Sequence, residues 1–181
     1  EATYVALASD WHLGERVRPK EVRGLNEYNP DIATQRAAQF WQSNRTMLNL
    51  ARAAWNVNQI VLWFGGDFLT NWIHEELVSE NYLSPTEEMK LCYDTLSTGL
   101  QFVLDHYDCE RVVVVTSSGN HGRNTAKKHA AGAFRTSYEF LLYQLLEERF
   151  RGRIEFQLGF GYENHYSVYG FRIRFHHGDE V

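Results

Sequence analysis

Side chains that commonly bind metal ions follow four apolar segments of this chain. The first three groups follow short runs rich in Val, Ile, Leu or Phe, at residues 4–8, 60–64 and 111–115, and the fourth follows the alternating segment that ends at Phe175. The four groups are Asp10-Trp11-His12, Gly65-Gly66-Asp67, Gly119-Asn120-His121 and His176-His177. Taken singly, each is typical of an ordinary polar turn, but the set in this order predicts one shared site.

The residue types in these groups suit a pair of divalent cations. A carboxylate such as Asp67 can bridge two ions through its two oxygens, and ions about 3.5–4 Å apart can clamp the attacking and leaving oxygens of a displacement at phosphorus. In Asp10-Trp11-His12, alternation sends both ligands to one side and Trp11 to the other. Carboxylate, imidazole and amide ligands without thiolate favour manganese, iron or zinc.

The elements that must position these groups alternate between strand and helix. The apolar runs predict strands, and helical periodicity is present at 32–56, with Asp31 as N-cap, at 86–107 and at 133–150. Residues 154–175 predict one or two further strands. Without a repeat or linker, residues 1–181 form a single α/β domain. Functional sites of such domains gather at the carboxyl ends of strands, so we expect the four strand ends to lie side by side.

Composition excludes some functions and locations. The 181 residues carry a net charge of −5, which does not favour a protein that coats nucleic acid. No segment reaches the roughly 18 apolar residues of a membrane helix. Cys92 and Cys109 cannot build a disulfide framework, which predicts a reducing compartment and a cytoplasmic location. The chain begins with Glu1 rather than Met, so the sequence leaves open a removed targeting segment.

These motifs resemble those of the calcineurin-like metallophosphoesterases. That family carries D-x-H, G-D, G-N-H, a lone His and G-H-x-H, and Asp10-Trp11-His12-Leu13-Gly14 is similar to the opening motif of its DNA-repair exonuclease branch. The resemblance implies a layered α/β/β/α sandwich with two divalent ions, manganese being favoured. It also implies roles for individual residues: Asp10 and His12 on the first metal, Asp67 bridging, Asn120 and His177 on the second, and His121 on the phosphate and leaving group.

The chain departs from the family pattern at two places. Gly122 follows His121 where most members have Asp, and no G-H-x-H follows His177. We therefore expect the C-terminal strands of the family fold to be missing from residues 1–181, with apolar sheet surface left exposed and metal bound weakly.

The substrate expected is a phosphate ester. The opening motif and the basic residues Arg123, Lys127 and Lys128 favour a phosphodiester such as DNA, with Arg123 contacting phosphate. The alternative for these basic residues is a solvated helix face. The acidic net charge favours instead a phosphatase for small nucleotides or phosphoproteins, and a non-enzymatic scaffold is the competing class. Nothing in the sequence indicates a protein partner.

Other residues near the motifs have two interpretations each. Phe68 and Trp72 either pack beneath a loop, which is favoured, or stack against a base or sugar. His74 is expected at the surface, where it could line the cleft. His176 is the alternative to His177 as a metal ligand, because alternation sends their side chains to opposite faces.

Overall fold

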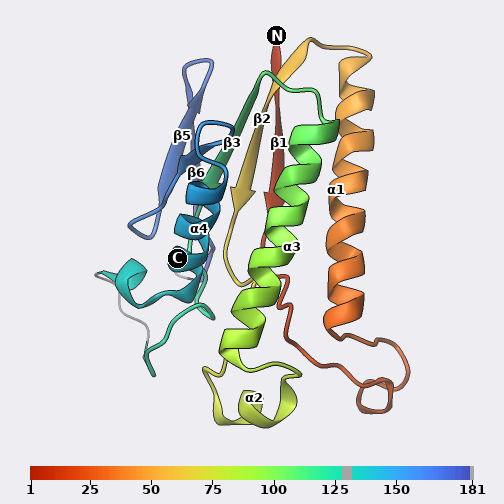
Figure 1. Ribbon diagram of the computed structural model, residues 1–181, viewed down its shortest axis with the longest axis vertical. Coiled ribbons are helices and arrows are strands. Elements are labelled where there is room, and N and C mark those ends of the chain that lie inside the picture. Colours follow the sequence, from red (N-terminus) through yellow and green to blue (C-terminus); the bar gives the residue numbers. More distant parts are fainter. Residues whose placement is uncertain (128–131, 180–181) are drawn as a thin grey trace.

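A parallel sheet forms the centre of the computed structural model, which describes residues 1–127 and 132–179. Its strands are β1 (Ala2–Ala8), β2 (Val57–Phe64), β3 (Arg111–Thr116) and β4 (Glu155–Gln157), paired in the order β1-β2-β3-β4 (Figure 1). The strands at 4–8, 60–64 and 111–115 are thus confirmed, with β1 and β2 beginning two and three residues earlier than expected. Lys128 lies outside the described residues.

Three helices cover one face of this sheet: α1 (Pro30–Arg52), α3 (Pro85–His106) and α4 (Tyr138–Arg149) (Figure 1). Their apolar side chains enclose the main core with alternate residues of the strands, such as Ile60, Leu62 and Phe64 of β2. A shorter helix, α2 (Glu75–Glu80), lies in the connection between β2 and α3. The α/β architecture expected from the sequence is therefore present.

A hairpin covers part of the other face. Its strands, β5 (Asn164–Val168) and β6 (Phe171–Phe175), form a separate antiparallel sheet. Tyr166 and Phe175 pack on Val61, Val113 and Val115 in a second core. The described residues thus form three layers, helices, sheet and hairpin, without the outer helical layer expected beyond the hairpin.

The segment at 154–175 contains more strands than expected. It forms β4, β5 and β6 rather than one or two strands, because Gly159 and Gly161 interrupt it after β4 has joined the main sheet. The strand preceding His177 is β6, which belongs to the second sheet. Contrary to the expectation from the sequence, this fourth strand therefore does not lie beside the other three, although His177 after it still reaches Asp67.

The first two long helices begin earlier than expected. Asn29, not Asp31, caps α1, and its side chain accepts a hydrogen bond from the Ile32 amide at 3.0 Å. Pro30 occupies the first helical position, where its missing N–H costs nothing. Ser84 caps α3 in a reciprocal capping box with Glu87, again followed by proline.

The helix expected at 133–150 is two elements. A 3-10 turn at Ala133–Thr136 precedes α4, and Ser137 between them has extended backbone, with φ −108° and ψ 121°. The Ser137 side chain caps α4 by accepting from the Phe140 amide at 3.2 Å. Residue 137 also pairs with Arg123 in an isolated β-bridge, so tertiary pairing prevents helix at this position.

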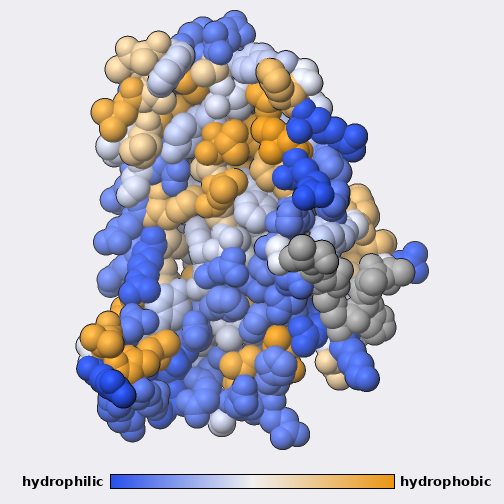
Figure 2. Space-filling model, turned by 180° about the vertical axis from the view of Figure 1, so that it is seen from behind, coloured by the Kyte–Doolittle hydropathy of each residue, from blue (hydrophilic) through white to orange (hydrophobic). Residues whose placement is uncertain are grey.

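Apolar side chains remain exposed on the hairpin face, as expected. The hairpin covers β2 and β3, whereas Val5 and Leu7 of β1 are 38% and 59% exposed. Phe171 of β6, in the hairpin itself, is 77% exposed. Figure 2 shows apolar surface gathered on this face. Among the described residues, no helix has the length and apolar character needed to cross a membrane.

Candidate metal centre

The loops after β1 and β2 run together beyond the sheet. The amides of Asp10 and His12 donate to the carbonyls of Gly66 and Asp67, both at 3.0 Å, and Leu13 continues this pairing with Phe68 at 2.9 Å. Parallel pairing therefore extends past the strand ends. It brings the Asp10-Trp11-His12 motif against Asp67, which lies 55 residues or more away in sequence.

Three of the predicted ligands have left-handed backbone. The φ angles of Asp10, His12 and Asp67 are 58°, 44° and 54°, a region that non-glycine residues seldom occupy. Such conformations persist where surrounding contacts enforce them, and they concentrate at functional sites. The neighbouring loops need glycine for close approach: a Cβ on Gly66 would lie 2.1 Å from the Gly119 amide nitrogen.

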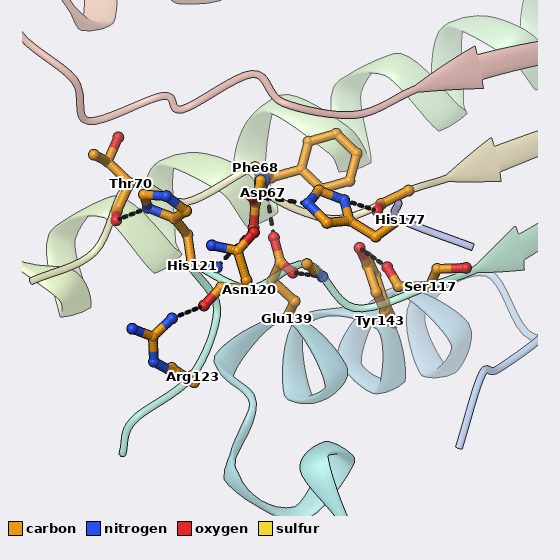
Figure 3. Close-up of polar contacts among 12 residues, drawn as sticks. Asp67, Phe68, Thr70, Ser117, Asn120, His121, Arg123, Glu139, Tyr143 and His177 are labelled. Atoms are coloured by element: carbon orange, nitrogen blue, oxygen red, sulfur yellow. Dashed lines mark hydrogen bonds and ion pairs between the residues drawn. The ribbon is translucent and has the colours of Figure 1, made fainter. Parts of the chain in front are cut away.

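Asp67 belongs to two groups of candidate ligands. One contains His12, Asp67 and His121; the other contains Asp10, Asp67 and His177. Within each group the candidate ligand atoms all lie within 4.8 Å of one another. Figure 3 shows the His177 ring pointing toward Asp67, with His121 on the other side of this carboxylate. Asp67 therefore lies where a bridging ligand would have to lie, with a carboxylate oxygen of Asp10 within 4.8 Å of it.

The two oxygens of Asp67 face different partners. Oδ1 accepts a hydrogen bond from the His121 amide at 2.8 Å, and Oδ2 lies 3.0 Å from Nε2 of His177. Burial acts to raise the pKa of this carboxyl, but the hydrogen bonds from His177 and the His121 backbone lower it overall. The side chain is therefore a buried carboxylate held by two hydrogen-bond donors.

Two histidines are oriented by backbone carbonyls. Nδ1 of His177 lies 2.8 Å from the Gly65 oxygen, and Nδ1 of His121 lies 2.7 Å from the Thr70 oxygen (Figure 3). A carbonyl oxygen can only accept, so each Nδ1 carries the proton and Nε2 is left for another partner. This arrangement is the usual one for histidines that bind metals through the opposite nitrogen.

His177 contacts Asp67 although it comes from the second sheet. Its side chain is only 7% exposed, and the hydrogen bond with Asp67 raises its pKa to about 9. A proton thus occupies the space between imidazole and carboxylate, where a cation would satisfy the same two groups. His176 instead lies near Tyr162, with ring centroids 5.9 Å apart. Of the two adjacent histidines, the structure brings His177 to Asp67. The candidate ligands of both groups are called the cluster from here on: Asp10, His12, Asp67, His121 and His177.

His12 is partly buried, and one of its ring nitrogens, Nδ1, makes no hydrogen bond to any of the described residues. Its ring meets that of His121 edge to face at 4.7 Å between centroids. Burial, followed by the charge of His121, lowers the pKa of His12, which favours the neutral form that ligates metals.

Asn120 and Arg123 lie at the edge of the cluster. Asn120 is next to Asp67 in Figure 3, and its carbonyl oxygen accepts a hydrogen bond from Nη1 of Arg123. The residues after Arg123 form bends rather than a helix, so the interpretation of this basic segment as a solvated helix face is wrong. Lys127 is exposed.

Two buried glutamates that lie outside the four sequence motifs connect the loops after β1, β2 and β3. Glu88 of α3 is fully buried and accepts from the amides of Gly14, Thr70 and Asn71 at 2.7, 2.7 and 2.9 Å. It therefore ties the loop after β1 to the loop after β2. A Cβ on Gly14 would lie 2.5 Å from the Glu88 carboxylate, which explains the glycine.

Glu139 of α4 makes the corresponding connection between the loops after β2 and β3. Its two oxygens accept from the amides of Phe68 and Gly119, both at 2.8 Å. Burial and the charge of Asp67 raise its pKa to about 8. A Cβ on Gly122 would lie 2.7 Å from Cγ of Glu139, so a side chain at position 122 and Glu139 would compete for the same space.

The sequence contains only a weak signal for these two glutamates. Each lies in the first turn of a helix, where acidic residues are common because they complement the helix dipole. Glu87, the neighbour of Glu88, occupies the same turn but is exposed and serves the capping box. Sequence alone does not separate the two.

The donor set fits divalent cations, since buried carboxylate and oriented imidazole groups converge on one place. Comparisons with protein-family models, with curated proteins and with solved structures gave no match for this chain.

Proposed function

We propose that this protein is a metal-dependent phosphoric ester hydrolase of the calcineurin-like type, which uses two divalent ions. The observation that carries the proposal is the position of Asp67, which belongs to two groups of candidate ligands at once. A shared carboxylate is the feature that distinguishes a two-ion site from two separate sites. The motif resemblance supports the same function independently of the geometry.

The residues divide into two sets in this proposal. The motif resemblance assigns Asp10 and His12 to one ion, Asn120 and His177 to the other, and Asp67 to both. The groups in the structure share Asp67 in the same way but pair Asp10 with His177 and His12 with His121. Two ions bound there would activate water and neutralise charge on the phosphate during in-line displacement. Manganese is the first choice, with iron and zinc as alternatives, because oxygen and imidazole ligands are mixed and thiolate is absent from the groups found.

His121 is the proposed proton donor to the departing oxygen. The Thr70 carbonyl fixes its ring and leaves Nε2 to face a substrate or a ligand. Positioned acids of this kind contribute about 100- to 10,000-fold to the rate. The same nitrogen could instead bind metal, because His121 lies in one group with His12 and Asp67. Measuring metal content in a His121 variant separates the two roles.

The favoured substrate is a phosphodiester, with DNA as the leading case. Arg123, held beside Asn120, is the proposed phosphate contact, since a guanidinium matches phosphate geometry. The second candidate is a phosphatase acting on small nucleotides or phosphoproteins, which the net charge of −5 favours.

Hydrolysis assays test the function directly. Bis-(4-nitrophenyl) phosphate, the corresponding monoester, and single- and double-stranded DNA would each be incubated with manganese, with zinc and with a chelator. We expect metal-dependent hydrolysis of the diester that Asp67→Asn abolishes. Absence of hydrolysis with every metal, or equal activity in Asp67→Asn, would overturn the proposal and favour a scaffold.

A further inference from the structure

A cleft opens beside the candidate metal centre. Its volume is about 390 Å³, within the range of roughly 300–1,000 Å³ that is usual for small-molecule sites. The loop after β2, helix α2, the first residue of α3, the loop after β3 and the first residue of α4 all contribute to its walls. Among the lining residues are Trp72, Glu75, Arg123, Asn124 and Thr125.

The cleft adjoins the cluster, although the candidate ligands themselves do not line it. The side-chain amide of Asn71 donates to the carbonyl oxygens of His121 and Arg123 at 2.8 and 2.7 Å, so the cleft wall and the cluster share one backbone segment. Nη1 of Arg123 donates to the Asn120 carbonyl. The cleft is therefore close enough to the cluster to receive a group attached to a phosphate bound there.

Trp72 presents an aromatic surface to the cleft. It is 43% exposed, whereas Phe68, four residues earlier, is fully buried in the core. The two interpretations of these aromatic residues thus separate: Phe68 packs, and Trp72 is free to stack. The Trp72 backbone is fixed, because its amide donates to Oδ1 of Asn71 at 2.8 Å and Asn71 itself has a left-handed φ of 56°.

The charges of the cleft favour a neutral occupant. Arg123 and Glu75 both line it, so a carboxylate opposes a second phosphate there. Asn124 and Thr125 supply hydrogen-bonding groups at the same wall. An exposed aromatic surface, balanced charge and amide and hydroxyl groups together match a planar ring with polar edges. Glu75 opposes a second anion, and Ile73, Val78 and Pro85 add apolar surface against which a flat ring can pack.

We propose that this cleft binds a nucleobase, joined through its sugar to the phosphate ester that is cleaved at the cluster. The inference rests on the proposed function for the position of the phosphate. It assigns the substrate class as nucleoside phosphate esters, whether a mononucleotide ester or a DNA strand. Stacking of one base on an aromatic side chain is worth about 5- to 150-fold in affinity.

The first experiment compares two substrates that share the scissile bond: thymidine 5′-(4-nitrophenyl phosphate) and methyl 4-nitrophenyl phosphate. The ratio of their kcat/KM values isolates the contribution of the nucleoside. We expect the wild-type protein to favour the nucleoside ester, Trp72→Ala to reduce the ratio about tenfold, and Trp72→Phe to retain most of it. An unchanged ratio in Trp72→Ala would overturn the inference.

Trp55→Ala is the matched control. Trp55 is 61% exposed and lies between α1 and β2, at the end of the sheet opposite the cluster. Its removal should leave the ratio at the wild-type value, and thermal melting would confirm that all variants fold. A thymidine tetranucleotide distinguishes a DNA strand from a mononucleotide ester as the substrate. A kcat/KM higher than that of the thymidine ester indicates a DNA strand, and an equal value indicates a mononucleotide ester. Preference for a phosphorylated peptide over the nucleoside ester would contradict the inference.

A binding measurement separates failure of this inference from failure of the proposed function. If neither ester is hydrolysed, the hydrolase proposal fails, and calorimetry with thymidine 5′-monophosphate and with deoxyribose 5-phosphate still tests the cleft. We expect the wild-type protein to bind the nucleotide more tightly than the sugar phosphate, and Trp72→Ala to lose this difference. Equal affinities in the wild-type protein would show that the cleft does not bind a base.

Discussion

Replacing Glu88 with Gln tests whether a single buried carboxylate holds the metal-binding loops in place. Oε1 of Glu88 accepts from Gly14 and Thr70, and Oε2 accepts from Asn71. Glutamine keeps one accepting oxygen. With that oxygen at the Oε1 position, two hydrogen bonds remain, but the new NH₂ group faces the Asn71 N–H and leaves that donor without a partner.

The size of the effect follows from these three contacts. An unpaired buried amide costs about 1–3 kcal/mol, and two hydrogen bonds to a neutral rather than a charged acceptor lose about 1 kcal/mol each. Removing a buried charge recovers part of this loss. We therefore expect the free energy of unfolding to fall by about 2–3 kcal/mol, which leaves a typical domain folded.

Urea denaturation at pH 7 measures this change as a shift in midpoint with an unchanged slope. The control is Asp105→Asn, which removes an exposed carboxylate from the same helix. Hydrolysis of the diester should also fall in Glu88→Gln but not in the control, because the loops after Asp10 and Asp67 lose a shared anchor. Unfolding free energies of the two variants within about 0.5 kcal/mol of each other would refute the reasoning.

Three further predictions address the cluster itself. His121→Asn should reduce turnover about 100-fold or more while manganese content per chain, measured by mass spectrometry, stays near the wild-type value; loss of the metal would make His121 a ligand instead. Asp67→Asn should lower both metal content and activity, and full occupancy in this variant would exclude a bridging role. In the metal-free protein, the raised pKa of His177, about 9 against 6.5 when unfolded, gives stability that is present below pH 6.5 and lost as the pH rises through 9. Glu139 also stabilises the fold less as the pH rises. Its pKa is raised from 4.5 to about 8, so the folded form keeps the proton to a higher pH than the unfolded form does. The melting temperature should therefore fall between pH 7 and 9.5, and fall less in His177→Gln; identical profiles would contradict this assignment.

The sequence by itself determined the positions of three of the four parallel strands and of the motifs at their ends. Apolar runs such as 60–64 and 111–115 are long enough for buried strands, and the polar residues after them cannot continue a core. Because parallel strands end at the same edge of a sheet, Asp10, Asp67 and Asn120 had to lie near one another. Local periodicity and neighbouring carboxyl ends therefore suffice for this part of the site.

Element boundaries were less certain because local signals compete with tertiary contacts. Asp31 and Asn29 are both residue types that cap helices. Pro30 favours the first helical position, which makes the preceding residue, Asn29, the cap. The helix expected at 133–150 is interrupted at Ser137, since that residue pairs with Arg123 across the loop after β3. Arg123 lies outside residues 133–150, so the periodicity of this segment alone does not predict the interruption.

Only the tertiary structure decided which groups support the cluster. His177 reaches Asp67 from a second sheet, 110 residues later in the chain, and packing of β6 rather than alternation selects it over His176. Glu87 and Glu88 are neighbours in the same helical turn, yet one is exposed and the other is buried beneath two loops. A helix turns by about 100° per residue, so adjacent side chains face different surroundings. What lies opposite each of them depends on how α3 packs, which is a property of the whole fold.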